Sequence, residues 1–228
     1  VQGEQGRPWR ALSFVEGQAF DRVASPAIAR QAGQLVARFH AALADLEYEY
    51  RHVRAGVHDT PRHLATLRAA LEAHRDHRLL SEIEPLAERL LAAAGRLPVL
   101  SDLPKRHAHG DLKISNLLFR GEEASCLVDL DTLGRMVWAF EVGDALRSWC
   151  NPRGEDVAEA SIDRQIFAAA LEGYGAVAKS VDLLSREEAL AVVDGLATLC
   201  LELSARFLLK VLVVAVIAGT IFGWYLHA

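Results

Sequence analysis

Residues 107–131 interrupt an otherwise helical pattern, and this interruption restricts the fold more than any other feature of the chain. Two short apolar segments, 116–119 and 125–131, are separated by the polar turn "RGEE". Strand-forming runs joined by a few polar residues are typical of a β-hairpin. On both sides of it, apolar residues recur at the spacing of amphipathic helices. We therefore expect a mostly helical α+β protein with one small hairpin.

Start signals for helices recur on both flanks. A capping residue followed by proline at the first helical position is found twice. The sequence "SREE" is a capping box, which predicts a long helix from Ser185. A third helix is expected over residues 80–95, with Pro85 near its first turn, and residues 9–17 predict a short strand. The two proline-containing starts are Ser25 with Pro26, and Asp59 or Thr60 with Pro61.

The composition is that of a folded protein with no obvious polyanionic partner. The chain has 228 residues, of which 51% are hydrophobic, enough for one domain or two small ones with a real core. A net charge of −5 without a long basic run gives no reason to expect nucleic acid. The 3 scattered cysteines and the polar first residues, which resemble no signal peptide, favour a cytoplasmic protein with reduced thiols.

The C-terminal residues 211–226 carry no charge, and only Thr220 has a polar side chain. Together with the apolar residues before Lys210, they approach the roughly 20 residues that a membrane-spanning helix needs. Three interpretations stay open: a buried terminal helix or strand, a membrane anchor within 207–226, or residues foreign to the fold. Lys210 and the two residues that follow the stretch argue against the anchor.

The stretch "HAHGDLKISNLLF", residues 107–119, gathers several titratable groups. His107, His109 and Asp111 match an H-x-H-x-D metal site, because imidazole and carboxylate groups ligate zinc or iron. Such sites need further histidines downstream, and only His227 follows. The polar groups could also simply cap turns, but two carboxylates at the end of a buried strand would then stay unexplained.

A third interpretation of this stretch is phosphoryl transfer. His109, Asp111 and Asn116 form the pattern H-x-D-x-x-x-x-N, in which the aspartate accepts a hydroxyl proton and the asparagine binds Mg²⁺. A second carboxylate should lie across the hairpin, where Asp129 and then Asp131 follow. Magnesium prefers oxygen ligands and keeps several waters, so asparagine, aspartate and nucleotide phosphates are sufficient.

The segment "HGDLKISNLLF", followed by "CLVDLDTLGRMVWAFEVGDALRSWCNP", resembles the aminoglycoside phosphotransferase and choline kinase family of small-molecule kinases. More narrowly, it is similar to the N-acetylhexosamine kinase branch. The segments "WRALSFVEGQAFDRVASP" and "VHDTPRHL" are also similar to that family, so the resemblance covers most of residues 8–209. It implies the C-lobe of a protein-kinase-like fold that uses ATP and Mg²⁺ to phosphorylate a hydroxyl of a small molecule, with a sugar or amino sugar favoured.

The resemblance also implies roles for individual residues. Asp111 would be the catalytic base and His109 would brace the catalytic loop. Lys113 would neutralise the transferred phosphoryl group, although it could equally be a solvated lysine. Asn116 and Asp129 would be the Mg²⁺ ligands.

Three further roles are implied outside that loop. Asp131 would lie just beyond the metal ligands or contact the substrate. Asp144 would be the helix carboxylate that bonds to the catalytic loop, unless it is an ordinary N-cap. The backbone of the segment before the first helix would meet the adenine, through Ser13, Phe14, Val15 and Glu16.

The expected organisation is a hinge segment over 1–17, a kinase-like C-lobe over 18–209 and an apolar tail over 210–228. A kinase of this fold also uses a Gly-rich loop and a lysine–glutamate pair in an N-lobe. No GxGxxG or V-A-x-K sequence is present. The sequence therefore predicts an absent N-lobe and weak activity for the chain alone. The alternative function is a non-catalytic pseudokinase remnant, attached to a membrane through its tail.

Overall fold

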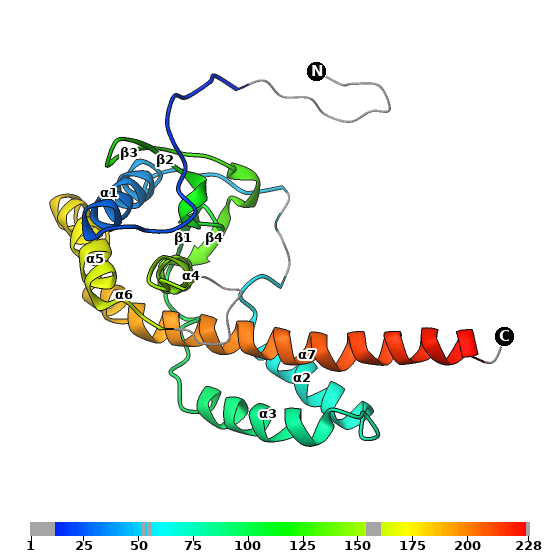
Figure 1. Ribbon diagram of the computed structural model, residues 1–228. Helices are drawn as coiled ribbons and strands as arrows, with labels where there is room; N and C mark the ends of the chain where they lie inside the picture. Colours follow the sequence, from blue (N-terminus) through cyan, green and yellow to red (C-terminus); the bar gives the residue numbers. More distant parts are fainter. Residues whose placement is uncertain (1–11, 52, 54–55, 154–160, 227–228) are drawn as a thin grey trace.

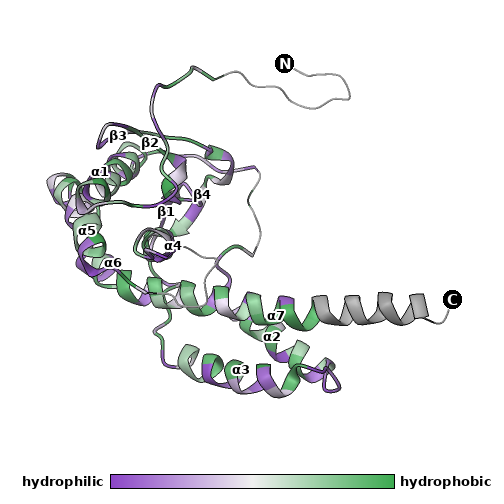
Figure 2. Cartoon of the chain, in the orientation of Figure 1, coloured by the Kyte–Doolittle hydropathy of each residue, from purple (hydrophilic) through white to green (hydrophobic). Residues whose placement is uncertain are grey.

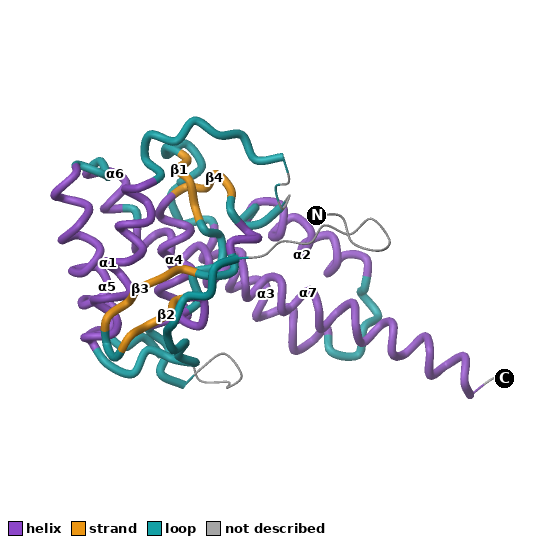
Figure 3. Tube along the Cα trace, turned by 90° about the horizontal axis from the view of Figure 1, so that it is seen from above, coloured by secondary structure: helices purple, strands orange, loops and turns teal. Residues whose placement is uncertain are grey.

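The computed structural model describes residues 12–226 except 52, 54, 55 and 154–160, with side chains up to residue 213. Two short strand pairs lie between two groups of helices (Figures 1 and 3). Helices α1 (Pro26–Ala42) and α5 (Arg164–Ala178) flank the strands on one side, and α2 (Thr60–Ala73) and α3 (Leu80–Ala94) lie on the other. The predicted α+β class and protein-kinase-like C-lobe are confirmed.

The remaining elements complete the order along the chain. The helices are α4 (Trp138–Trp149), α6 (Arg186–Leu190) and α7 (Val192–Leu226). The strands are β1 (Lys105–Ala108), β2 (Leu117–Arg120), β3 (Glu123–Leu127) and β4 (Gly134–Val137), and the 3₁₀ turns are η2 (Ile114–Asn116), η3 (Leu130–Thr132) and η4 (Lys179–Val181).

The strand pairs bring two polar connections to one place. The antiparallel hairpin β2–β3 is the one that the sequence predicts. Strand β1 pairs with β4, also antiparallel, with Lys105 opposite Val137 and His107 opposite Arg135. The β1–β2 and β3–β4 connections therefore lie side by side, and they carry the two halves of the predicted phosphoryl-transfer motif.

The capping signals in the sequence are confirmed. The Ser25 side chain accepts a hydrogen bond from the Ile28 amide at the start of α1. Of the two candidates before α2, Asp59 is the N-cap, because its carboxylate accepts from the Arg62 amide at 3.2 Å. The capping box of Ser185 begins α6.

Three local predictions differ from the structure. The helix from Ser185 is not continuous, since α6 ends at Leu190 and α7 begins at Val192. Pro85 lies in the second turn of α3 rather than near its first. Of the strand predicted over 9–17, residues 9–11 lie outside the described residues and 12–17 form no strand. Their only nearby pairing is a single bridge between Gln18 and Phe119, so the segment lacks the partner ladder that stabilises a strand.

The main core joins α1, α4 and α5 to the hairpin. Helices α1 and α5 cross so closely that a Cβ atom at Gly33 would collide with the backbone of Ala170. The same holds where Gly195 of α7 meets Ala139 of α4. Glycine is required at both crossings because backbone lies directly against backbone.

A second, smaller core joins α2 and α3 to α7, through side chains such as Leu67, Ala87 and Leu212. Apolar residues occur along most of the described part of α7 (Figure 2). The helix runs to Leu226 without a break at residue 210, where the sequence predicted the start of a tail. Within the described residues, no helix combines the length and apolar character needed to cross a membrane.

Candidate active site

A buried carboxylate on α4 fixes the turn that follows β1. Glu141 accepts hydrogen bonds from the backbone amides of His109 and Gly110, the second at 3.0 Å. Gly110 has a φ of +81°, and a Cβ atom there would lie 2.5 Å from the carbonyl oxygen of Thr132. The turn therefore requires both a glycine and an internal acceptor.

Glu141 is itself held by the helices on either side. Its second oxygen lies 2.7 Å from His40 Nε2, and His40 Nδ1 lies 2.8 Å from the Tyr174 hydroxyl. Burial opposes ionisation of Glu141. The nearby His40 and the two backbone amides outweigh that effect, so the pKa of Glu141 is lowered. A charged acceptor thus faces the two amides of the turn.

His109 connects this turn to the β3–β4 connection. Its side chain is fully buried, and its Nε2 lies 2.9 Å from the carbonyl oxygen of Val128. The Thr132 hydroxyl donates to the carbonyl oxygen of His109 at 2.7 Å. The Val128 amide in turn donates to the carbonyl of Asn116 at 2.9 Å. These bonds hold the two polar connections against each other.

Asp111 and Asn116 belong to the same folded turn. The Asn116 side-chain amide donates to the carbonyl oxygen of Asp111 at 2.9 Å, which directs the side-chain oxygen of Asn116 away from that bond. Asp111 is about one third exposed, with 31% of its side-chain surface accessible, and Lys113 Nζ lies 3.1 Å from its Oδ2. The aspartate therefore combines access to a ligand with a neighbouring positive charge.

Asp129 adopts a strained backbone conformation at the start of η3. Its φ and ψ are 62° and 58°, in the left-handed region that aspartate and asparagine tolerate better than other non-glycine residues. Strain of this kind is concentrated at functional sites. The backbone amide of Val128 donates to the carbonyl oxygen of Asn116, so the backbone of Asp129 follows directly after a residue that is bonded to Asn116.

The oxygen groups suit a hard cation better than zinc. Asp111, Asn116 and Asp129 offer carboxylate and amide oxygens, the ligands that Mg²⁺ prefers alongside water and phosphate. The alternative H-x-H-x-D site is wrong. The His107 ring is hydrogen-bonded to Tyr50 and to the Leu46 carbonyl instead. Among the described residues, no group of three or more histidine, cysteine, aspartate or glutamate side chains could hold a metal.

The turn after β1, residues 109–111, is the candidate catalytic turn. The helix carboxylate that bonds to it is Glu141, so the prediction that Asp144 has this role is wrong. Asp144 lies in the interior of α4, where it pairs with Arg147 at 2.9 Å, and it is not an N-cap. Three residues along a helix displace a side chain by about 4.5 Å along the axis. The signal missed in the sequence is a carboxylate on the apolar face of a helix. Asp131, in η3, is exposed.

The segment expected to meet the adenine, residues 13–16, is mostly exposed beside the hairpin. Phe14 has 91% of its surface accessible. The carbonyl oxygen of Glu16 accepts from Arg120 Nε at 3.3 Å. This contact fixes the segment against β2.

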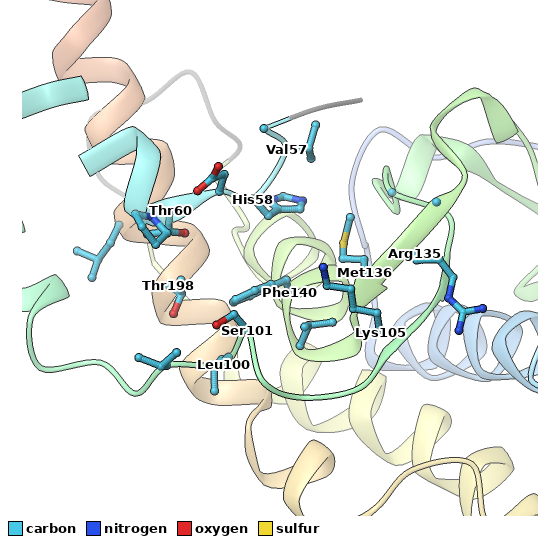
Figure 4. A pocket seen from close by; sticks show the side chains of 18 of the residues that line it. Val57, His58, Thr60, Leu100, Ser101, Lys105, Arg135, Met136, Phe140 and Thr198 are labelled. Atoms are coloured by element: carbon cyan, nitrogen blue, oxygen red, sulfur yellow. The ribbon is translucent and has the colours of Figure 1, made fainter. Parts of the chain in front are cut away.

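A cavity of about 570 Å³ opens next to the catalytic turn. Gly110 and Thr132 lie at its edge. The rest of its wall comes from α2 and the loop before it, the α3–β1 connection, α4, α7 and the β1–β4 pair (Figure 4). Its size lies within the range typical of small-molecule sites. The sequence gives no spacing pattern for this wall, because residues from distant segments form it. Those that offer polar or aromatic groups include His58, Thr60, Ser101, Lys105, Arg135, Phe140 and Thr198.

A kinase-like C-lobe with this turn and an adjoining cavity defines the class of small-molecule phosphotransferases. The chain belongs to the phosphotransferase enzyme family, whose model matches residues 1–178. The resemblance stated from the sequence is therefore confirmed at the family level.

Curated relatives and a solved structure agree with this assignment. A homoserine kinase of Methylobacterium radiotolerans is 30% identical over 217 residues, covering 91% of this chain and 58% of the relative. A homoserine kinase of Rhodopseudomonas palustris is 30% identical over 151 residues, covering 64% of this chain and 42% of the relative. An ethanolamine kinase of Plasmodium vivax shares the fold, with a TM-score of 0.51, 11% identity, and coverage of 86% of this chain and 58% of that chain. The chain thus spans about half the length of the curated relatives it matches.

These relatives support a small-molecule kinase but not a sugar kinase. The amino-sugar acceptor favoured by the sequence resemblance therefore has no support among them.

Proposed function

We propose that this chain transfers the γ-phosphate of ATP to a hydroxyl group of a small molecule. The observation that carries the proposal is the hydrogen-bonded unit of Asp111, Asn116 and the segment before Asp129. It adjoins Gly110 and Thr132, which line a cavity. Positioning and electrostatic stabilisation supply most of the catalysis in phosphoryl transfer, and the rigid hydrogen bonds of this unit support such a positioning role.

Each residue of the unit has a role in the proposal. Asp111 accepts the proton of the acceptor hydroxyl as its oxygen attacks phosphorus. Lys113, which now pairs with Asp111, balances negative charge on the transferred group. Asn116 and Asp129 hold Mg²⁺, which when bound neutralises charge on the nucleotide phosphates.

Other groups support these residues without touching the reacting atoms. His109 and Glu141 keep the catalytic turn in place through the buried hydrogen bonds described above. The backbone of residues 13–16 contacts the adenine in this proposal, since that segment lies beside the β2–β3 hairpin, which begins directly after Asn116.

The acceptor occupies the cavity beside Gly110 and Thr132, with its hydroxyl toward Asp111. The names of the relatives suggest small hydroxyl compounds such as homoserine or ethanolamine. An N-acetylhexosamine belongs in the test because the sequence resemblance favours it.

The test is acceptor-dependent release of ADP from ATP and Mg²⁺ by the purified chain, measured with each of these compounds. Asp111→Asn should lower the rate by about 100-fold or more, since removal of a general base has effects of that order. Nucleotide affinity, measured by calorimetry, should stay unchanged in that variant. Asp76→Asn, an exposed aspartate between α2 and α3, is the matched control. Wild-type turnover by Asp111→Asn would disprove the base assignment, and binding of Mg-ATP without turnover would favour a pseudokinase.

A further inference from the structure

The charged groups that line the acceptor cavity are mostly positive. Lys105 and Arg135 contribute cationic groups and His58 contributes an imidazole, whereas Asp59 is the only carboxylate among the described lining residues. The Asp59 carboxylate already caps α2 through the Arg62 amide. The wall of the cavity therefore offers more positive than negative charge to a bound molecule.

Lys105 is the cation most available to a ligand. Among the described residues, the Lys105 side chain has no hydrogen-bond or ion-pair partner, since only its backbone pairs, with Val137 across the β1–β4 pair. Figure 4 shows its side chain directed into the cavity toward His58, whereas the Arg135 side chain turns away. Arg135 Nη1 lies 2.9 Å from His107 Nε2, the ring of its neighbour across the β1–β4 pair.

His58 faces Lys105 from the loop before α2, and its conformation is unusual. Its φ of 56° lies in the left-handed region, which is uncommon for non-glycine residues. Its Nδ1 is buried without a hydrogen-bond partner in the described structure. This nitrogen faces the Glu202 carboxylate, so it is not the atom that a ligand in the cavity would contact.

Glu202 lies behind His58, away from the ligand space. Its Oε1 is 3.7 Å from His58 Nδ1, and its Oε2 accepts from the Thr60 hydroxyl at 2.7 Å. Only 2% of the Glu202 side chain is accessible. The carboxylate thus supports the His58 ring from behind, while the ring itself lines the cavity.

We infer that the acceptor carries a carboxylate group, which Lys105 and His58 bind from the wall of the cavity. This inference rests on the proposed function for the identity of the cavity as the acceptor site. Charge-assisted hydrogen bonds between an ammonium group and a carboxylate are among the strongest that a binding site can offer, and an imidazole ring adds a further hydrogen-bonding group. A hydroxy acid or a hydroxyl-bearing amino acid therefore fits the site. An amino alcohol lacks the carboxylate that Lys105 and His58 would bind.

Four compounds distinguish the contribution of a carboxylate from that of an amine in such an acceptor. Homoserine has both a carboxylate and an amine, 4-hydroxybutyrate has only the carboxylate, and 3-aminopropan-1-ol has only the amine. N-acetylglucosamine is an uncharged comparison. Binding of each compound to the purified chain is measured by calorimetry without ATP. Homoserine and 4-hydroxybutyrate should bind at least about tenfold more tightly than 3-aminopropan-1-ol, the factor that corresponds to about 1.4 kcal/mol.

Two variants connect the selectivity to the named residues. Lys105→Met should weaken binding of both carboxylates by about tenfold and leave that of 3-aminopropan-1-ol unchanged. His58→Asn, which suits a left-handed backbone, should show a smaller loss with the same selectivity. Lys179→Met, at an exposed position in η4, is the control and should bind like the wild type. Equal binding of 3-aminopropan-1-ol and homoserine, no binding of any carboxylate, or unchanged affinity in Lys105→Met would overturn the inference.

The same compounds distinguish this inference from the proposed function. Selective binding of carboxylates without ADP release would support the acceptor site and contradict the phosphotransferase proposal for this chain. Efficient phosphorylation of 3-aminopropan-1-ol or N-acetylglucosamine in preference to the carboxylates would support the phosphotransferase and overturn the carboxylate site.

Discussion

Glu141 and His40 form a buried hydrogen-bonded pair, with Glu141 Oε2 2.7 Å from His40 Nε2 and no more than 3% of either side chain accessible. The pair joins α4 to α1, while the other oxygen of Glu141 holds the catalytic turn. One carboxylate thus connects the core of the fold to the geometry of the site.

Glu141→Gln should damage both stability and activity. The change keeps the shape of the side chain but removes the charge that the two backbone amides and His40 contact. Because these groups are buried, we expect a loss of about 3 kcal/mol in the free energy of unfolding. Urea denaturation measures this loss, and ADP release should fall with it. In Glu172→Gln, which breaks the exposed contact to Arg30, the loss should stay below about 1 kcal/mol. Equal effects of the two changes would contradict the role assigned to Glu141.

Stability should decrease at acidic pH. Burial opposes ionisation of Glu188, but the two bonds from Arg106, at 2.6 and 2.9 Å, and the Ser185 cap lower its pKa below the ordinary 4.5. A carboxylate with a lowered folded-state pKa contributes stability that is fully present above its unfolded-state pKa and is lost as the pH falls through the folded-state value. Glu141 and Glu202 act in the same direction.

The measurement for this pH effect is the free energy of unfolding between pH 7 and pH 3. It should fall as the pH drops below about 4.5. Glu188→Gln should be less stable at pH 7 and show a shallower fall. Arg106→Met should also flatten the curve, because it removes the main group that lowers the pKa of Glu188. A curve with the wild-type slope in both variants would refute the assignment.

Gly110→Ala should impair the catalytic turn. Alanine is strained at a φ of +81°, and its Cβ atom would meet the carbonyl oxygen of Thr132. We expect a loss of more than about 1 kcal/mol in stability and a fall in phosphoryl transfer. Gly121→Ala is the control, because Gly121 has a φ of +61° with nothing within 4 Å of the added methyl group. It shares the backbone strain without the collision, so transfer should survive. Similar kinetics in the two variants would show that close packing at Gly110 is unimportant.

Asp129→Asn should separate metal binding from folding. Asparagine tolerates the left-handed conformation as well as aspartate does, so the thermal midpoint should change little. Loss of the carboxylate should raise the Mg²⁺ concentration needed for nucleotide binding, which a magnesium titration in the presence of ATP measures. Asp182→Asn, also left-handed with a φ of 49° but located after η4, should leave the titration unchanged. An identical magnesium requirement in the wild type and Asp129→Asn would exclude Asp129 as a ligand.

Short-range signals in the sequence were sufficient for much of the local structure. The caps at Ser25, Asp59 and Ser185 and the β2–β3 hairpin depend on residues within a few positions of each other. The pattern from His109 to Asn116 predicted the family for the same reason, since the turn that it forms is local. Side-chain and backbone groups so close in sequence meet whatever the rest of the fold is.

Tertiary structure alone decided which carboxylate supports that turn and which residues line the cavity. Glu141 and Asp144 lie on the same helix, and only the packing of α4 against α1 and the β1–β2 connection distinguishes them. His58 and Lys105 lie 47 positions apart in the sequence, yet they line one cavity. Contacts between distant segments depend on how whole helices pack, and a local sequence pattern does not determine that packing.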